Sequence, residues 1–150
     1  MHFPTSYDIL IVLSKEAPMN QELLSKLQEI TPEEQAILNG QQDICKDLYT
    51  SQNEFIVDSR KLLEKGRLIE IRPHTRFAHF PKHTHNYVEM IYMCSGTTTH
   101  IINDTERIHL KEGDILFLNQ NTTQEILPAS IEDIAINFII LPEFFTRSLS

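Results

Sequence analysis

Four side chains able to do chemistry alternate along residues 83–89: His83, His85, Tyr87 and Glu89. Successive side chains of a β-strand point to opposite faces, so a strand here would project all four to the same side. Imidazole and carboxylate groups are costly to bury without partners. The segment therefore predicts a face that holds a metal ion, binds a polar ligand, or closes on itself in a hydrogen-bond network.

The elements expected to position this segment are short strands. From residue 67 onward apolar residues recur with a period of two, and Gly, Asn, Asp and Pro separate the runs. The expected strands cover residues 67–72, 74–80, 87–94, 97–102, 107–111, 115–118, 123–127 and 131–141. Many short strands with regular turns are typical of an antiparallel sandwich or barrel. A short helix can begin at Pro142.

The first 66 residues predict helices instead. Leucines at spacings of three and four indicate an amphipathic helix over 20–30. A second helix is predicted from Thr31, an N-cap residue followed by Pro and two Glu, through Leu48, with Asn39-Gly40 as an interruption. A third is predicted over 52–65, ending at a glycine.

Composition narrows the function classes. The 150 residues include 13 Lys+Arg and 21 Asp+Glu, a formal net charge of −8, and such a surface repels the phosphates of nucleic acids. The chain by itself is therefore a poor DNA binder. Cys45 and Cys94 lack a metal-binding spacing and predict reduced thiols. No stretch has the pattern of a signal peptide or the length of a membrane span, so we expect a cytoplasmic protein without a membrane partner.

The spacing His83-x-His85-x3-Glu89-x6-Gly96 resembles the first motif of the cupin family, from its first His to its closing Gly. The family has an earlier Gly five residues before the first His. That position is Phe77 in this chain, so the earlier Gly is missing.

The second cupin motif is matched only in part. Residues 113–118, a Gly-Asp turn followed by an apolar run, resemble its beginning. Asn119 and Asn121 then stand where the motif has Pro and Gly, and Gln124 stands where it has a metal-binding His. The resemblance therefore extends to the shape of the motif and not to its full set of metal ligands.

Residues of about 67–145, with the strand before Pro142 and the sequence after it, resemble the N-terminal sensor cupin of AraC-type transcription regulators. The resemblance implies a mainly β fold, a cupin double-stranded β-helix or jelly-roll barrel, preceded by an α-helical N-terminal segment. The expected division is a helical segment at 1–66, a cupin barrel at 67–142, and at 143–150 the start of a helical linker. That linker would lead toward a C-terminal DNA-binding domain absent from this chain.

Regulators of this type couple a small-molecule-binding, often dimerising cupin to a DNA-binding domain. The resemblance thus implies a small polar effector, such as a sugar or related metabolite, as the partner of a homodimer that contacts DNA only through the C-terminal domain. The barrel residues expected to bind the effector are His83, His85, Tyr87, Glu89 and Gln124. No cofactor is expected.

Two other interpretations of the same residues stay open. His83, His85 and Glu89 could hold a divalent transition metal, which would make the chain a small cupin enzyme, an oxygenase or isomerase. The amide of Gln124 is a much weaker ligand than the imidazole it replaces. Alternatively, Glu89 could accept a hydrogen bond from one His in a network without any ligand.

The remaining histidines are expected outside the site. His74 and His79 have opposite strand parity, so only one can face inward, and a position at the rim or surface is predicted. His100 and His109 have polar neighbours and are predicted to face solvent.

Overall fold

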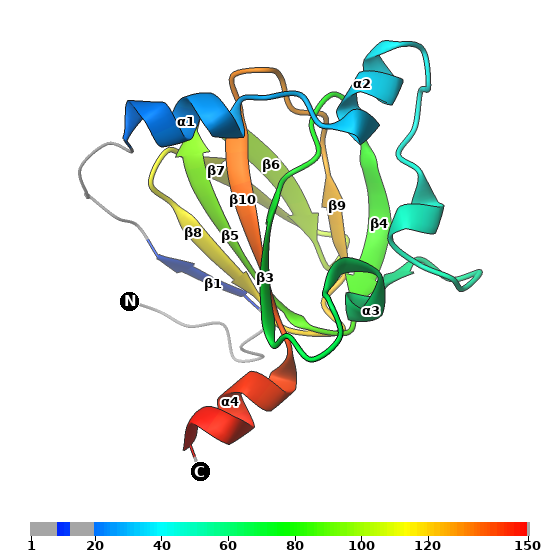
Figure 1. The fold of residues 1–150 in the computed structure, drawn as a ribbon, viewed down its shortest axis with the longest axis vertical. Helices are drawn as coiled ribbons and strands as arrows, with labels where there is room; N and C mark the ends of the chain where they lie inside the picture. The colour runs from blue at the N-terminus through cyan, green and yellow to red at the C-terminus, as the bar shows by residue number, and fades with distance from the viewer. Residues whose placement is uncertain (1–8, 13–19, 150) are drawn as a thin grey trace.

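Two five-stranded β-sheets form the body of the protein (Figure 1), described by a computed structural model that covers residues 9–12 and 20–149. The first sheet has the order β1 (Ile9–Val12), β8 (Ile115–Leu118), β5 (Val88–Ser95), β10 (Ile134–Ile140) and β3 (Ile69–Pro73). The second has the order β2 (Ile56–Val57), β4 (Phe80–His85), β9 (Gln124–Ile126), β6 (Thr97–Ile102) and β7 (Glu106–Lys111). All pairings are antiparallel except that of β2 with β4. The predicted mainly β fold is confirmed.

The helices are short and lie at the ends of the sheets. They are α1 (Gln21–Leu27), α2 (Pro32–Leu38), the 3-10 helix η1 (Lys46–Leu48), α3 (Ser59–Leu62) and α4 (Pro142–Leu149). The predicted start at Thr31 is confirmed by a capping box, in which its hydroxyl accepts from the Glu34 N–H while the Glu34 carboxylate accepts from the Thr31 N–H. The helix predicted to begin at Pro142 is confirmed as α4.

The prediction of a helical first 66 residues is wrong in three places. Residues 9–12 form strand β1 beside β8, and the second helix ends at Leu38 because Gly40 adopts a φ of 114°, outside the helical range. The third helix, predicted over 52–65, is replaced by β2 and the single turn α3. Within this segment Ile56 and Val57 pair with β4 at the edge of the second sheet. This pairing outweighs the helix-like spacing of the apolar residues.

Two expectations around the motif are also wrong: residues 74–79 form no strand, and residues 83–89 do not alternate along one strand. Strand β4 ends at His85, and β5 begins at Val88 after a turn. His83 and Glu89 therefore belong to two strands in different sheets. The four chemical side chains are all buried, but a turn between the sheets brings them together and the alternation of one strand does not.

Backbone geometry at the glycine positions of the two cupin motifs shows which of them require glycine. The closing Gly96 has a φ of 68°, and a Cβ there would lie 2.8 Å from main-chain atoms of Glu132 and Asp133, so a side chain has no room. Phe77 and Asn121, which stand where the resemblance places glycines, have φ values of 73° and 71°. Both positions thus keep the left-handed conformation for which Gly is the usual residue, and Asn tolerates it better than Phe does.

The hydrophobic core has two parts. One fills the space between the sheets with side chains that are almost completely buried, namely Ile91, Met93, Ile102, Leu110, Leu116, Leu118 and Ala135. The other joins the N-terminal segment to the barrel, and its members are Ile37, Ile44, Tyr49, Val57, Ala78, Phe80, Tyr87, Ile126 and Ile139. The N-terminal residues are therefore part of the folded domain. No helix in the described part of the chain is long and apolar enough to cross a membrane.

A buried ion pair fastens the N-terminal helices to the barrel. The guanidinium of Arg76 donates to both carboxylate oxygens of Glu34, at 2.6 and 3.0 Å, and both side chains are at most 3% exposed. The same guanidinium also donates to the main-chain oxygens of Ile131, Gln28 and Glu29 at 2.9 to 3.2 Å. We call this group the Glu34–Arg76 clamp.

Candidate functional site

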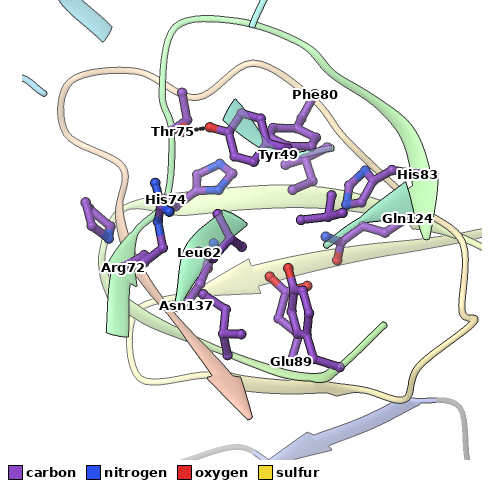
Figure 2. Close-up of a pocket in the computed structure, with 15 residues that line it drawn as sticks. Tyr49, Leu62, Arg72, His74, Thr75, Phe80, His83, Glu89, Gln124 and Asn137 are labelled. Atoms are coloured by element: carbon purple, nitrogen blue, oxygen red, sulfur yellow. Dashed lines mark hydrogen bonds between the residues drawn. The ribbon is translucent and has the colours of Figure 1, made fainter. Parts of the chain in front are cut away.

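A small cavity of about 50 Å³ lies between the two sheets, and most of the side chains that line it come from strands of both (Figure 2). The lining includes His83 from β4, Glu89 from β5, Gln124 from β9 and Asn137 from β10. One wall comes from the N-terminal segment and consists of Tyr49, Leu62 and, on the edge strand β2, Val57. The cavity is thus covered by the part of the chain that the Glu34–Arg76 clamp fastens.

Four of the five residues predicted to bind the effector line this cavity: His83, Tyr87, Glu89 and Gln124. His83 pairs with Gln124 across β4 and β9, which places the Gln directly beside the first imidazole of the motif. His85 lies behind the lining, where its ring stacks on Tyr87 with centroids 4.7 Å apart. Its Nε2 is 3.4 Å from Glu89 Oε2. The structure therefore brings the predicted residues together, with His85 contacting the cavity only through its neighbours.

Main-chain carbonyls fix the tautomers of both motif histidines. His83 Nδ1 lies 2.8 Å from the Pro81 oxygen, and His85 Nδ1 lies 2.6 Å from the Tyr87 oxygen. A carbonyl oxygen only accepts, so each Nδ1 carries the proton and donates it. Burial lowers the pKa of both imidazoles to about 4, so both rings are neutral near pH 7. Each Nε2 is consequently left as a hydrogen-bond acceptor.

Glu89 is buried without a cationic partner among the described residues. Burial raises the pKa of its carboxyl to about 7, and no positive charge lowers it again. The nearest basic atom, His85 Nε2, is an acceptor in the neutral ring, so two acceptors face each other at 3.4 Å unless a proton lies between them. Burial and the Glu89 charge also raise the pKa of the adjacent Tyr87 phenol. The site therefore contains an acid that is partly ionised at neutral pH.

Two amide side chains of the lining have unsatisfied atoms. Within the described part of the chain, neither amide atom of Gln124 has a hydrogen-bond partner, and the same is true of Asn137 Oδ1. Gln124 is 1% exposed, and its amide lies close enough to His100 to act on the pKa of that imidazole, although the contact does not reach hydrogen-bond geometry. Figure 2 shows the ends of Gln124 and Glu89 pointing toward the same space. Unpaired buried polar atoms are costly, so this cavity is prepared for a polar occupant.

Two predictions about the other histidines are wrong. His74, expected at the rim or surface, is 5% exposed and lines the cavity. His100, expected to face solvent, is completely buried and shares a hydrogen bond of 2.8 Å with the Thr98 hydroxyl. Burial lowers their pKa values to about 4 and 3. His79 and His109 are exposed as predicted. His100 was misjudged because its polar threonine neighbours bond to imidazoles and do not mark a wet face.

The cavity also contains residues that the sequence reasoning did not assign to it. Asn137 interrupts the apolar run of β10, and a single amide in such a run is a signal that could have identified it. Tyr49 gave no such signal. Its hydroxyl donates to Glu33 Oε2 at 2.5 Å and lies 3.0 Å from the Thr75 hydroxyl, contacts that only the folded N-terminal segment creates.

The donor set fits a metal poorly. Transition metals in cupins need several ligand atoms within about 2.0–2.2 Å of one point. In the described part of the chain no three His, Cys, Asp or Glu side chains converge in this way. His83 and Glu89 line the cavity, His85 lies behind it, and Gln124 replaces the fourth imidazole. The residues present thus do not reproduce a metal centre.

Comparison with solved structures found several distant likenesses. A cupin protein from Bacteroides fragilis is 25% identical, with 50% of this chain and 66% of that chain covered and a TM-score of 0.38. The DMSP lyase DddQ from Ruegeria pomeroyi is 11% identical, with 89% and 78% covered and a TM-score of 0.47. A putative ethanolamine utilization protein Q from Salmonella typhimurium is 19% identical over 49% of this chain, with a TM-score of 0.39, and the match spans 56% of that protein. No curated protein matches.

Comparison with protein families identifies the family of this chain. The model of the AraC-like ligand binding domain matches residues 68–146, which is more than half of the 150 residues. The matched region contains β3 to β10 and every barrel residue that lines the cavity. The family is of the cupin type, so the predicted cupin barrel is confirmed. This chain belongs to the family of AraC-like ligand binding domains.

Proposed function

We propose that this chain is the effector-sensing and dimerising domain of a cytoplasmic AraC-type transcription regulator, and that its cavity binds a small polar, sugar-like metabolite. The observation that carries the proposal is a cavity in the family's ligand-binding region whose walls hold unpaired amide atoms of Gln124 and Asn137. A sugar hydroxyl both donates and accepts, so it can satisfy such atoms. DNA would be contacted through a separate C-terminal domain.

The size of the cavity supports a conformational mechanism. About 50 Å³ accommodates one or two waters or a small polar group, whereas effector pockets usually measure about 300–1,000 Å³. A complete metabolite must therefore displace a wall. The wall formed by Tyr49, Val57 and Leu62 is the part of the lining that is held least by the sheets. Only Val57 belongs to a strand, the two-residue edge strand β2. Binding would shift the population toward an arrangement with this segment moved, and that change would alter how a linked domain is presented.

Thermal unfolding with a metabolite library tests the proposal. A ligand that binds the folded state raises the melting temperature in proportion to the logarithm of its concentration over its Kd. We expect stabilisation by at least one small polar metabolite, and loss of that shift in Asn137→Leu, which removes an unpaired amide. Asn53→Leu, at an exposed position, is the matched control and should keep the response. A library without any stabilising compound would refute the effector proposal.

The alternative is a small metal-dependent cupin enzyme. It is favoured by the tautomers of His83 and His85, since each leaves Nε2 free as a ligand atom. Metal analysis of protein purified without chelator separates the two functions. Stoichiometric metal that disappears in His83→Ala would support the enzyme, whereas stabilisation by a metabolite in metal-free buffer would support the sensor.

A further inference from the structure

Several polar groups of the cavity lining are hydrogen-bond acceptors without a partner, beside donors such as the Gln124 amide nitrogen and the Arg72 guanidinium. Glu89 presents a carboxylate, His83 has its Nε2 lone pair left over, and Gln124 and Asn137 each have an unpaired amide oxygen. The complementary occupant is a group with several donors and a positive charge. We propose that the cavity receives the ammonium group of a protonated amine, so that the effector is an organic cation such as an amino sugar. This inference rests on the proposed function and names its ligand class.

Charge balance supports an ammonium group over a neutral hydroxyl. A buried carboxylate without a counter-ion carries a large desolvation cost, and a paired cation offsets it. An ammonium also has three N–H donors, which matches the number of acceptors better than the single donor of a hydroxyl. Its compact size suits a cavity of about 50 Å³, so the head group can enter while the rest of the effector displaces the wall.

The apolar part of the lining is suited to a cation as well. Tyr49, Phe80 and Tyr87 all line the cavity, and Tyr49 meets Phe80 edge to face with centroids 5.0 Å apart. Aromatic faces attract an ammonium through the negative potential of the ring. A carboxylate beside aromatic walls is a common solution for amine recognition because it combines charge pairing with a desolvated surface.

No described side chain already neutralises Glu89. Arg72 lines the same cavity, but no hydrogen bond or ion pair joins it to Glu89 in the described part of the chain. His85, the nearest base, is a neutral acceptor. A cationic occupant would therefore supply the counter-charge of the ionised Glu89 carboxylate.

Matched ligands on the full chain test the inference. Glucosamine, N-acetylglucosamine and glucose share one ring and differ in charge, so their Kd values are compared by calorimetry at pH 7.5 and constant ionic strength. We expect glucosamine to bind about 10- to 100-fold more tightly than the two neutral sugars. In Glu89→Gln this preference should fall to within about twofold, whereas Glu106→Gln, at an exposed position of β7, should retain it.

The smallest probe gives a second measurement that does not depend on a variant. Methylammonium chloride should shift the imidazole Nε2 resonance of His83 in wild-type protein, and potassium chloride or methanol at the same concentration should not. Equal binding of neutral and amino sugars, or stabilisation by acidic metabolites alone, would overturn the inference and leave the effector-sensing proposal standing. A chain stabilised by no metabolite of any charge would overturn both.

Discussion

Two buried carboxylates in this molecule have opposite environments. Glu34 is 1% exposed and accepts from the Arg76 guanidinium, the Arg76 N–H and the Thr31 N–H. Burial alone would raise its pKa, but these hydrogen bonds and the Arg76 charge hold it below the ordinary value. Glu89 is 4% exposed, accepts no hydrogen bond from the described residues and has a pKa raised to about 7.

The difference separates a carboxylate whose partners the protein supplies from one that lacks them among the described residues. At Glu34 the protein itself supplies every partner, so the charge fixes the position of the N-terminal helices. At Glu89 the partners are missing, and the missing partners are donors. A fold tolerates such an unpaired group where a ligand completes it. The clamp and the cavity share the N-terminal segment, because the clamp fastens the helices that precede Tyr49 in the cavity wall.

The largest effect is expected from breaking the clamp. Arg76→Leu leaves Glu34 buried without its counter-ion and should lower the free energy of unfolding by about 3–5 kcal/mol. Chemical denaturation at pH 7 measures it. Lys26→Ala removes an exposed pair with Glu22 at 4.0 Å and, as the control, should change stability by less than about 0.5 kcal/mol. A loss below about 1 kcal/mol in Arg76→Leu would mean that the helices are held by apolar packing alone.

Sequence reasoning succeeded where the signal is local and failed where partners are remote. The capping box at Thr31, the helix at Pro142 and most strands of the second half follow from neighbouring residues, whereas the strand predicted over 74–80 is replaced by β4 at Phe80–His85. The Glu34–Arg76 pair joins residues 42 positions apart, and nothing in either local sequence announces it.

The candidate site shows the same limit. The motif predicted His83 and Glu89 on one face; both line the cavity, but they reach it from two strands joined by a turn and not from one strand. The contributions of Tyr49 and His74 to the cavity depend on how the N-terminal segment and the end of β3 fold over the barrel. Alternation along a strand carries no information on such long-range coverage.

The second largest expected effect is the change in stability with pH that Glu89 causes. The folded pKa of Glu89 lies above its ordinary value of 4.5, so its contribution to stability is full below pH 4.5 and is lost as pH rises through about 7. At pH 8 this cost is about 3 kcal/mol. Buried His74, His83 and His100 act in the opposite direction, because the stability they contribute is lost as pH falls from 6.5 through about 4 for His74 and His83 and about 3 for His100.

The contribution of Glu89 to the pH dependence of stability is therefore obtained by comparing a Glu89 variant with wild type. We expect Glu89→Gln to gain stability relative to wild type between pH 5 and pH 8. The free energy of unfolding of wild type falls over this range because its buried acid ionises, and the variant has no such acid. Denaturant titrations at half-unit intervals measure the slope. A flat difference would show that Glu89 titrates normally in the folded protein and has a partner.

A smaller effect of opposite direction is expected at Gln124. Gln124→Met conserves volume and removes two unpaired buried amide atoms, so it should raise the free energy of unfolding by about 1–2 kcal/mol. It should also weaken ligand stabilisation, which separates this residue from those of the clamp. Gln120→Met, at an exposed position, should leave both unchanged. Destabilisation in Gln124→Met would indicate that the amide has a hydrogen-bond partner after all, with His100 the nearest one.

The smallest expected change in stability concerns backbone conformation near the clamp and near the cavity. Phe77 follows the Arg76 of the clamp and Asn121 precedes the Gln124 of the cavity, and both have left-handed φ values. Asn tolerates this conformation, whereas Ala does not, so Asn121→Ala should cost about 1 kcal/mol in thermal or chemical unfolding. Gln120→Ala, next to it without a positive φ, should cost nothing measurable. If both variants behave alike, the turn can relax, and the position of Gln124 in the cavity does not depend on the left-handed residue that replaces the motif's glycine.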